Sequence, residues 1–150
     1  MQKWQQKIKE LDAVMNRTDR LYMRFAKICG VNHYTIQILY ILKHMNVRTQ
    51  KDIVDLFGLP KQTVNTIVNQ LATNGYISFA VDTKDRRGKI ISLTPDGKKY
   101  AEKLTAPLLQ CETNVLQKIG SDKVSLLIQG LREYARHLEQ EIDNFQNGMK

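Results

Sequence analysis

Apolar side chains recur every three or four residues along the first 30 positions, which predicts one long amphipathic helix. A second helical stretch follows Gly30, begins at an Asn32 cap and is apolar around most of its circumference as far as Leu42. We expect this stretch to be a buried core helix that ends near residues 44–46. The apolar stripe of the first helix has one polar member and runs through Trp4, Ile8, Leu11, Met15, Thr18, Tyr22, Phe25 and Cys29.

Two shorter helical patterns follow, and only Leu59 and Pro60 separate them. The first has a Thr49 cap with Asp52 three residues on and stops at Gly58, and the second covers residues 61–74. Two helices joined by a tight glycine-containing turn predict a helix-turn-helix. Residues 76–81 and 89–93 then predict two strands, joined by a charged hairpin loop over 82–88 that would form a small wing.

The last third of the chain predicts two more amphipathic helices. Thr94-Pro95-Asp96 is a strong helix start, and Gly120-Ser121 separates the two helices. The predicted fold class is therefore mainly α with a small β-hairpin wing (α+β). The apolar stripe of the first of these helices is Ala101, Leu104, Leu108, Cys111, Val115 and Ile119, and that of the second is Val124, Leu127, Ile128, Leu131, Tyr134, Leu138, Ile142 and Phe145.

The helix over residues 61–74 has one apolar face and one uncharged polar face. The apolar face holds Val64, Ile67, Val68 and Leu71, and the other holds Gln62, Asn65, Thr66, Asn69 and Thr73. An ordinary solvated face is rich in Glu and Lys, whereas Asn and Gln can pair with adenine in the major groove and Thr methyls can meet thymine methyls. A base-reading helix is favoured, with a plain surface helix as the alternative.

The predicted hairpin loop adds cations directly after this helix-turn-helix. Guanidinium groups on a projecting hairpin suit phosphates or a narrow A·T-rich minor groove, although a charged tip can also serve solubility alone. Asp85 can pair with a neighbouring arginine and hold the loop in shape. The predicted wing set is Lys84, Asp85, Arg86, Arg87 and Lys89.

The charge of the chain favours a polyanionic partner. It has 23 Lys and Arg against 15 Asp and Glu, a net charge of +8. Residues 1–47 carry +5, residues 48–99 carry +4 and residues 100–150 carry −1. Lys and Arg gathered in one region attract phosphates. No apolar run reaches the roughly 18 residues of a membrane span, and the start lacks a signal-like stretch, so we expect a cytoplasmic protein with no membrane partner.

The residue types that carry catalysis or metal binding are sparse. We find no phosphate-binding glycine loop, nucleophile elbow or paired acids, so we predict neither an enzyme nor a cofactor. His33, His44 and His137 lack metal-ligand spacing, and no metal site is predicted. Cys29 and Cys111 lie on apolar stripes, where we expect small packed hydrophobic residues.

Residues 49–97 resemble the MarR family (multiple-antibiotic-resistance regulators) of winged-helix transcription factors. The matching text is residues 49–58, then Thr63-Val64, Leu71, Gly75, Asp85-Arg86-Arg87, and Leu93-Thr94-Pro95-Asp96-Gly97. The resemblance implies a regulator, most often a repressor, that binds double-stranded DNA at a palindrome and responds to a small aromatic or amphipathic effector, whose pocket residues are unknown. Its recognition-helix contacts would be Lys61, Gln62, Thr63, Asn65, Thr66 and Asn69.

The resemblance also implies a homodimer held together by the terminal helices. It divides the chain into a dimerisation helix over 1–30, a winged domain over 31–97 and dimerisation helices over 98–150. Packing within one chain is the alternative explanation of the apolar stripes. The residues that a dimer would bury are Trp4, Ile8, Leu11, Met15, Leu131, Leu138, Ile142 and Phe145.

The chain departs from the family pattern at four positions. Many relatives have a Ser or Asp where it has Pro60, an Arg where it has Thr66, and arginines where it has Phe79 and Ala80. With few cations on the recognition helix, we predict an A·T-rich operator and a modest dependence of affinity on salt. Two other functions remain open: a winged-helix module whose basic face binds an acidic protein, and a thiol-based redox sensor.

Overall fold

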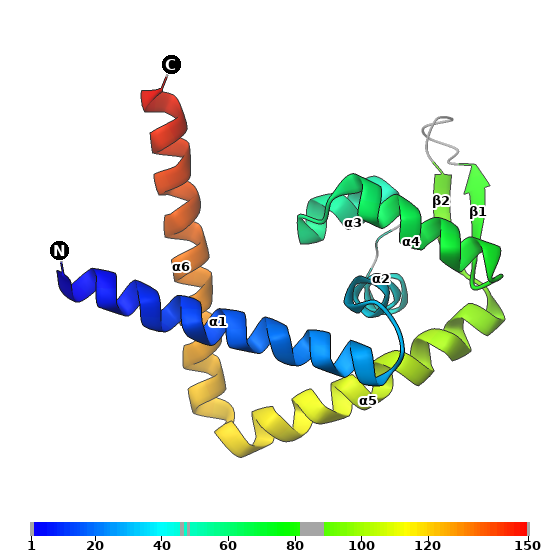
Figure 1. The fold of residues 1–150 in the computed structure, drawn as a ribbon, viewed down its shortest axis with the longest axis horizontal. Helices are drawn as coiled ribbons and strands as arrows, with labels where there is room; N and C mark the ends of the chain where they lie inside the picture. The colour runs from blue at the N-terminus through cyan, green and yellow to red at the C-terminus, as the bar shows by residue number, and fades with distance from the viewer. Residues whose placement is uncertain (1, 46, 48, 82–88, 150) are drawn as a thin grey trace. The chain divides into compact units, whose positions relative to one another are not determined.

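The computed structural model describes residues 2–45, 47, 49–81 and 89–149. It confirms a mainly helical chain with one antiparallel hairpin (Figure 1). The chain folds into two compact units, residues 1–108 and 109–150. In chain order the elements are α1 (Gln2–Ile28), α2 (His33–His44), α3 (Gln50–Phe57), α4 (Lys61–Thr73), β1 (Ile77–Val81), β2 (Lys89–Leu93), α5 (Pro95–Ile119) and α6 (Ser121–Gly148).

Helix α2 is the centre of the first unit, as its apolar circumference predicts. It contacts α1, α4 and β2, and Lys43 forms an ion pair with Glu102 of α5. Figure 1 shows it end-on between α4 and the first half of α5. Its buried side chains meet apolar residues from the elements around it. The core consists of Ala26, Ile36, Ile38, Leu39, Ile41, Ile53, Leu59, Val64, Ile67, Val68, Leu71, Ile77, Ile91, Ala101 and Leu104.

The predicted helix ends are confirmed at atomic detail. Asn32 Oδ1 accepts the backbone N–H of Tyr34 at 2.8 Å, which caps α2. Thr49 and Asp52 form a reciprocal capping box at the start of α3. Gly58 closes α3 with φ 60° and ψ 22°, a left-handed conformation that glycine adopts without steric cost.

The hairpin is tied to the start of α5 through Thr94. Its hydroxyl donates to the Gly75 carbonyl at 2.7 Å and accepts the N–H of Gly97 at 3.0 Å, while its own N–H donates to the Tyr76 carbonyl at 3.0 Å. A side chain at Gly97 would place its Cβ 1.7 Å from that carbonyl oxygen. The rings of Tyr76 and Tyr100 stack at 4.2 Å beside this junction. The Leu-Thr-x-x-Gly sequence is thus the joint that fixes the wing to α5.

The second unit contains the C-terminal part of α5, from Leu109 onward, and the whole of α6. None of the described residues of α6 is buried. The unit boundary lies just after Pro107, a residue within α5 that has no N–H for the helical hydrogen-bond ladder. The expectation that Cys111 is a packed hydrophobic residue is wrong in this chain: Cys111 is exposed, because the apolar core of the first unit ends before it.

Candidate nucleic-acid interface

The two faces of α4 are separated as the sequence predicts. Val64 and Val68 are fully buried, and Ile67 and Leu71 nearly so, which anchors α4 on α2 and α3. Buried Leu59 fixes the turn that leads into α4, and Pro60 begins the helix without a side-chain cap. The side chains left exposed on the opposite face are Lys61, Gln62, Asn65, Thr66, Asn69, Gln70, Thr73 and Asn74. The packing of one face therefore presents the other to solvent.

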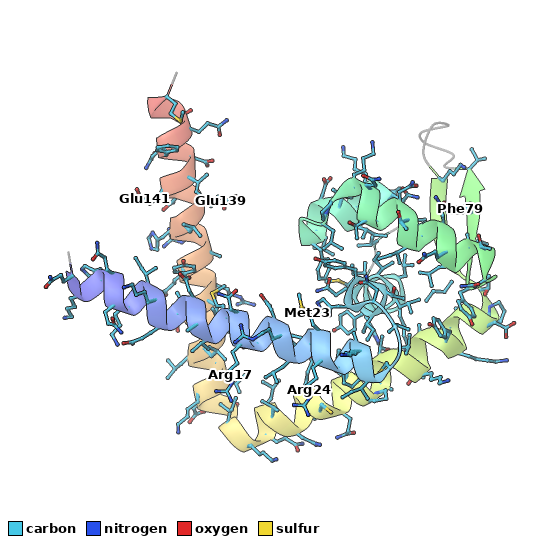
Figure 2. All side chains as sticks on the ribbon, viewed as in Figure 1. Arg17, Met23, Arg24, Phe79, Glu139 and Glu141 are labelled. Atoms are coloured by element: carbon cyan, nitrogen blue, oxygen red, sulfur yellow. The ribbon has the colours of Figure 1, made fainter. Side chains whose placement is uncertain are left out.

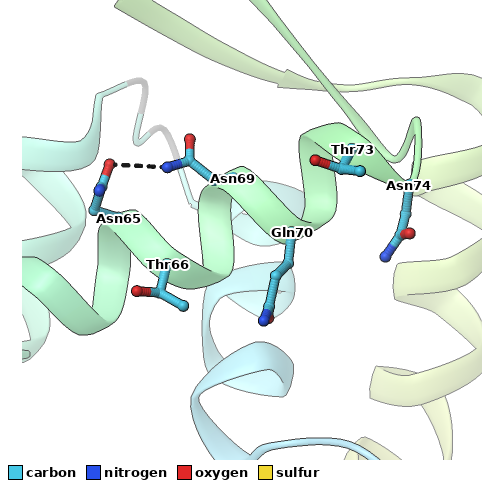
Figure 3. Close-up of a pocket in the computed structure, with 6 residues that line it drawn as sticks. All are labelled: Asn65, Thr66, Asn69, Gln70, Thr73 and Asn74. Carbon is cyan, nitrogen blue, oxygen red and sulfur yellow. Dashed lines mark hydrogen bonds between the residues drawn. The ribbon is translucent and has the colours of Figure 1, made fainter.

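The exposed face of α4 carries two rows of uncharged polar side chains at intervals of four residues. One row is Asn65, Asn69 and Thr73, and the other is Gln62, Thr66, Gln70 and Asn74. A shallow open pocket of about 420 Å³ lies along the C-terminal two-thirds of these rows (Figure 3). Gln70 and Asn74 are not in the predicted contact set, although the four-residue spacing that starts at Gln62 reaches both.

Two hydrogen bonds order this face. Asn69 Nδ2 donates to Asn65 Oδ1 at 3.3 Å, as the dashed line in Figure 3 marks. Thr66 Oγ1 donates to the backbone carbonyl of Gln62 at 2.9 Å. The hydroxyl hydrogen of Thr66 is therefore used inside the helix, and its methyl group remains available for an apolar contact.

The predicted contact set is not uniformly accessible. Thr63 is half-buried, whereas Gln62, Asn65, Thr66 and Asn69 are exposed. Thr63 therefore lies at the edge of the exposed face.

Helix α4 has the electrostatics of a surface that accepts a polyanion. Its sequence contains one cation, Lys61, at its first position and no Asp or Glu. The unpaired N–H groups at the start of a helix also favour negative charge. This helix therefore has no carboxylate that would repel a phosphate backbone.

Of the five predicted wing residues, Lys89 belongs to the described part of the chain. Lys84, Asp85, Arg86 and Arg87 lie outside the described residues. Lys89 is exposed on β2, and its Nζ lies 5.4 Å from the centre of the Phe79 ring. Figure 2 labels Phe79 on β1. This cation–π contact holds a positive charge at the base of the wing.

The described histidines and cysteines do not form a cluster. Among the described residues, no three His, Cys, Asp or Glu side chains lie where they could share a metal ion. The His33 ring lies 6.1 Å from that of Tyr22, and burial lowers the pKa of His33, an effect that Asp19 partly opposes. Cys29 is half-buried against the core, as expected. No helix in the described part of the chain is long and apolar enough to cross a membrane.

The helix-turn-helix of α3 and α4, followed by a two-stranded hairpin, defines a winged helix-turn-helix protein. A family model described as the MarR family matches residues 26–88. The chain is 29% identical to NMB1585, a MarR family regulator from Neisseria meningitidis, with a TM-score of 0.81 over 92% of this chain and 97% of that one. The chain is thus similar to the MarR family, whose members are transcriptional regulators and not enzymes.

Three further similarities are informative. The chain is 28% identical over 101 residues to YwaE of Bacillus subtilis (strain 168), an uncharacterized HTH-type transcriptional regulator, and the match covers 67% of this chain and 59% of YwaE. A match to YwoH of the same organism covers 57% of that protein. The chain also shares the fold of S. aureus MepR, solved as a DNA complex, at 19% identity and a TM-score of 0.71 over 88% of this chain and 97% of that one.

Proposed function

We propose that the protein is a sequence-specific regulator that binds double-stranded DNA as a homodimer and represses transcription by occupying an operator. The exposed face of α4 carries this proposal, because it is uncharged beyond Lys61, rich in amides and presented by a helix whose other face is buried. Amide side chains read base edges in the major groove, whereas a helix face that serves only solubility does not need to be rich in amides. MepR, which shares the fold, was solved as a DNA complex.

The proposed operator is A·T-rich and palindromic. Asn and Gln pair with adenine through its N6 and N7 groups, and the free methyl of Thr66 suits the methyl of thymine. Two copies of α4 related by a two-fold axis would meet two half-sites about one helical turn apart. Lys61 and the wing cations would supply phosphate or minor-groove contacts.

The homodimer is proposed from apolar side chains that the chain leaves uncovered. Trp4 and Ile8 on α1 are 69% and 54% exposed, and Ile142 and Phe145 on α6 are 56% and 70% exposed. Each lies on one of the apolar stripes described above, and exposed apolar side chains aligned along one face of a helix indicate an interaction site. A symmetric pair of chains would bury these stripes against each other.

The proposed effector site is a pocket of about 480 Å³ at the corner between α1 and α2. Its lining combines aromatic, apolar and cationic groups, which suit an aromatic carboxylate: Lys27 would pair with the carboxylate, and His33 and Tyr34 would contact the ring. The lining residues are Met23, Lys27, Gly30, Val31, Asn32, His33 and Tyr34. Such a ligand releases DNA only through a higher affinity for the arrangement that does not fit the operator.

Selection of duplexes from a random pool at about 150 mM salt tests the proposal, followed by anisotropy titration of the enriched sequence and of a scrambled control. We expect a palindromic, A·T-rich sequence bound at least about 10³-fold more tightly than the scrambled duplex. Enrichment of a G·C-rich sequence would contradict the operator assignment. Failure to enrich any sequence, repeated with refolded and ligand-stripped protein, would reject DNA regulation in favour of an acidic protein partner.

The effector site has its own test. Benzoate and salicylate serve as probe aromatic carboxylates, and each is titrated into the protein–operator complex. We expect release of the wild-type protein and a weaker response of Lys27→Met, which keeps the side-chain length and removes the charge. An equal response of both proteins would exclude Lys27 from the site.

A further inference from the structure

The amide groups of Asn65 and Asn69 are joined on the exposed face of α4. They lie one helical turn apart, and the bond from Asn69 Nδ2 to Asn65 Oδ1 measures 3.3 Å. Figure 3 shows the two side chains reaching toward each other on the same side of the helix. An unrestrained Asn amide can turn over and exchange its donor and acceptor ends, whereas this bond keeps the Nδ2 end of Asn69 toward Asn65.

The bond leaves Asn69 with a defined set of free hydrogen-bonding groups. Nδ2 has two hydrogens and uses one, so one donor remains beside the acceptor Oδ1. In the major groove, adenine offers an acceptor at N7 and a donor at N6, which is the complement of this pair. Guanine offers acceptors at both N7 and O6, so Oδ1 would face another acceptor.

We infer that Asn69 selects adenine at one position of the operator and that Asn65 is the positioning residue that sets the orientation of its amide. This inference rests on the proposed function and names the base that one part of the interface reads. Asn65 itself keeps both hydrogens of Nδ2, which can donate to an acceptor on the neighbouring nucleotide. The pair thus works as one reading unit.

The surroundings of the pair support this assignment. Asn65 and Asn69 are both exposed, so a base edge can reach them. The pocket that adjoins them is lined by uncharged side chains only, Asn65, Thr66, Asn69, Gln70, Thr73 and Asn74. Among these described lining residues, no charged group competes for the amide of Asn69.

The test compares base preference among variants of the full chain. The enriched operator is changed one base pair at a time, and affinities are measured for the wild type, Asn69→Ala, Asn65→Ala and Asn65→Asp. Asn69→Ala identifies the position, where we expect the wild type to prefer adenine about 5- to 150-fold. Asn65→Ala should lose most of that preference at the same position.

Asn65→Asp separates positioning from a merely structural role. Its carboxylate keeps an acceptor for Asn69 Nδ2, so the adenine preference should survive, while its negative charge weakens binding to every duplex alike. Thr73→Ala, an exposed neighbour in the same row that is outside the pair, serves as the control and should retain the preference. Far-ultraviolet circular dichroism checks that each variant keeps its helices.

Two results would overturn the inference while leaving DNA binding intact. In one, Asn65→Ala keeps the full adenine preference; in the other, Asn65→Asp loses it as completely as Asn65→Ala. Failure of the wild-type protein to enrich any duplex is a different result, because it rejects the proposed function and the inference with it.

Discussion

Neighbouring residues at the start of α4 have different roles in the proposed interface. Lys61 brings a charge without base information, whereas Gln62 brings an amide that can pair with one base edge. Both side chains are exposed, so substitution disturbs little packing. The two residues therefore provide a matched comparison on one turn of helix.

We expect Gln62→Ala to cost about 1–3 kcal/mol of binding free energy at the selected operator and almost nothing on random DNA. Lys61→Ala should weaken binding to both and lower the salt slope by about 1. Anisotropy titrations at several salt concentrations measure both effects. Equal losses of Gln62→Ala on operator and random DNA would remove Gln62 from the base-reading residues.

His33 makes the stability of the protein depend on pH. Burial lowers its pKa in the folded chain, with partial opposition from Asp19, so the unfolded chain binds the proton more tightly. The free energy of unfolding is therefore highest above the unfolded pKa of about 6.5, where His33 is neutral in both states. It decreases as the pH falls through that value toward the lower folded pKa. Urea unfolding at pH 8 and pH 5 should show a smaller decrease for His33→Asn than for the wild type. The same decrease in both proteins would contradict this assignment.

The joint between wing and α5 shows how one element is fixed to the next. Thr94 bonds to both sides of the junction, and α5 approaches Tyr76 so closely that only a glycine fits at position 97. The stacked rings of Tyr76 and Tyr100 extend this contact by one turn. The joint thus adds to the contacts of β1 with α4 and of β2 with α2 in placing the wing.

Gly97→Ala is expected to destabilise the protein by about 3 kcal/mol, at the upper end of the cost of overpacking, because backbone atoms must move to admit the Cβ. Gly130→Ala is the matched control, since no heavy atom lies within 4 Å of the added carbon on α6. Replacing a helical glycine by alanine there should raise stability by about 0.5–1 kcal/mol. Chemical denaturation measures both, and similar values for the two variants would exclude a tight joint.

The sequence predicts those elements whose signals are local. Asn32, the Thr49–Asp52 box and Gly58 act within a few residues of themselves, and the periodicity of α4 separates its two faces without knowledge of any partner. The Gly97 contact is different, because it depends on how Tyr76 is placed by the preceding turn. The Asn65–Asn69 bond cannot be predicted from the sequence either, since its i, i+4 spacing permits a bond but does not select it over solvent.

At the scale of the whole molecule, the apolar stripes of α1 and α6 are the largest feature that a single chain leaves unexplained. Among the described residues of α1, only Ala26 is buried, and none of α6 is. The exposure of Cys111, on the apolar stripe of α5, belongs to the same pattern. A second copy of the chain would cover such stripes without any change of fold.

Ile142→Glu tests this partner directly, because it puts a charge in the C-terminal part of the α6 stripe while leaving the core of the first unit unchanged. Burial of an unpaired charge in an interface costs several kcal/mol, so we expect a dimer that dissociates to monomers at micromolar concentration. Leu126→Glu is the control: Leu126 is 68% exposed on α6 but lies off the stripe, and its variant should stay dimeric.

Sedimentation velocity gives the mass of each species, and circular dichroism gives the helical content. A wild-type protein that sediments as a monomer, or an Ile142→Glu variant that remains dimeric, would contradict the interface. Because two heads must meet two half-sites, the monomeric variant should also lose its preference for the palindrome over a single half-site.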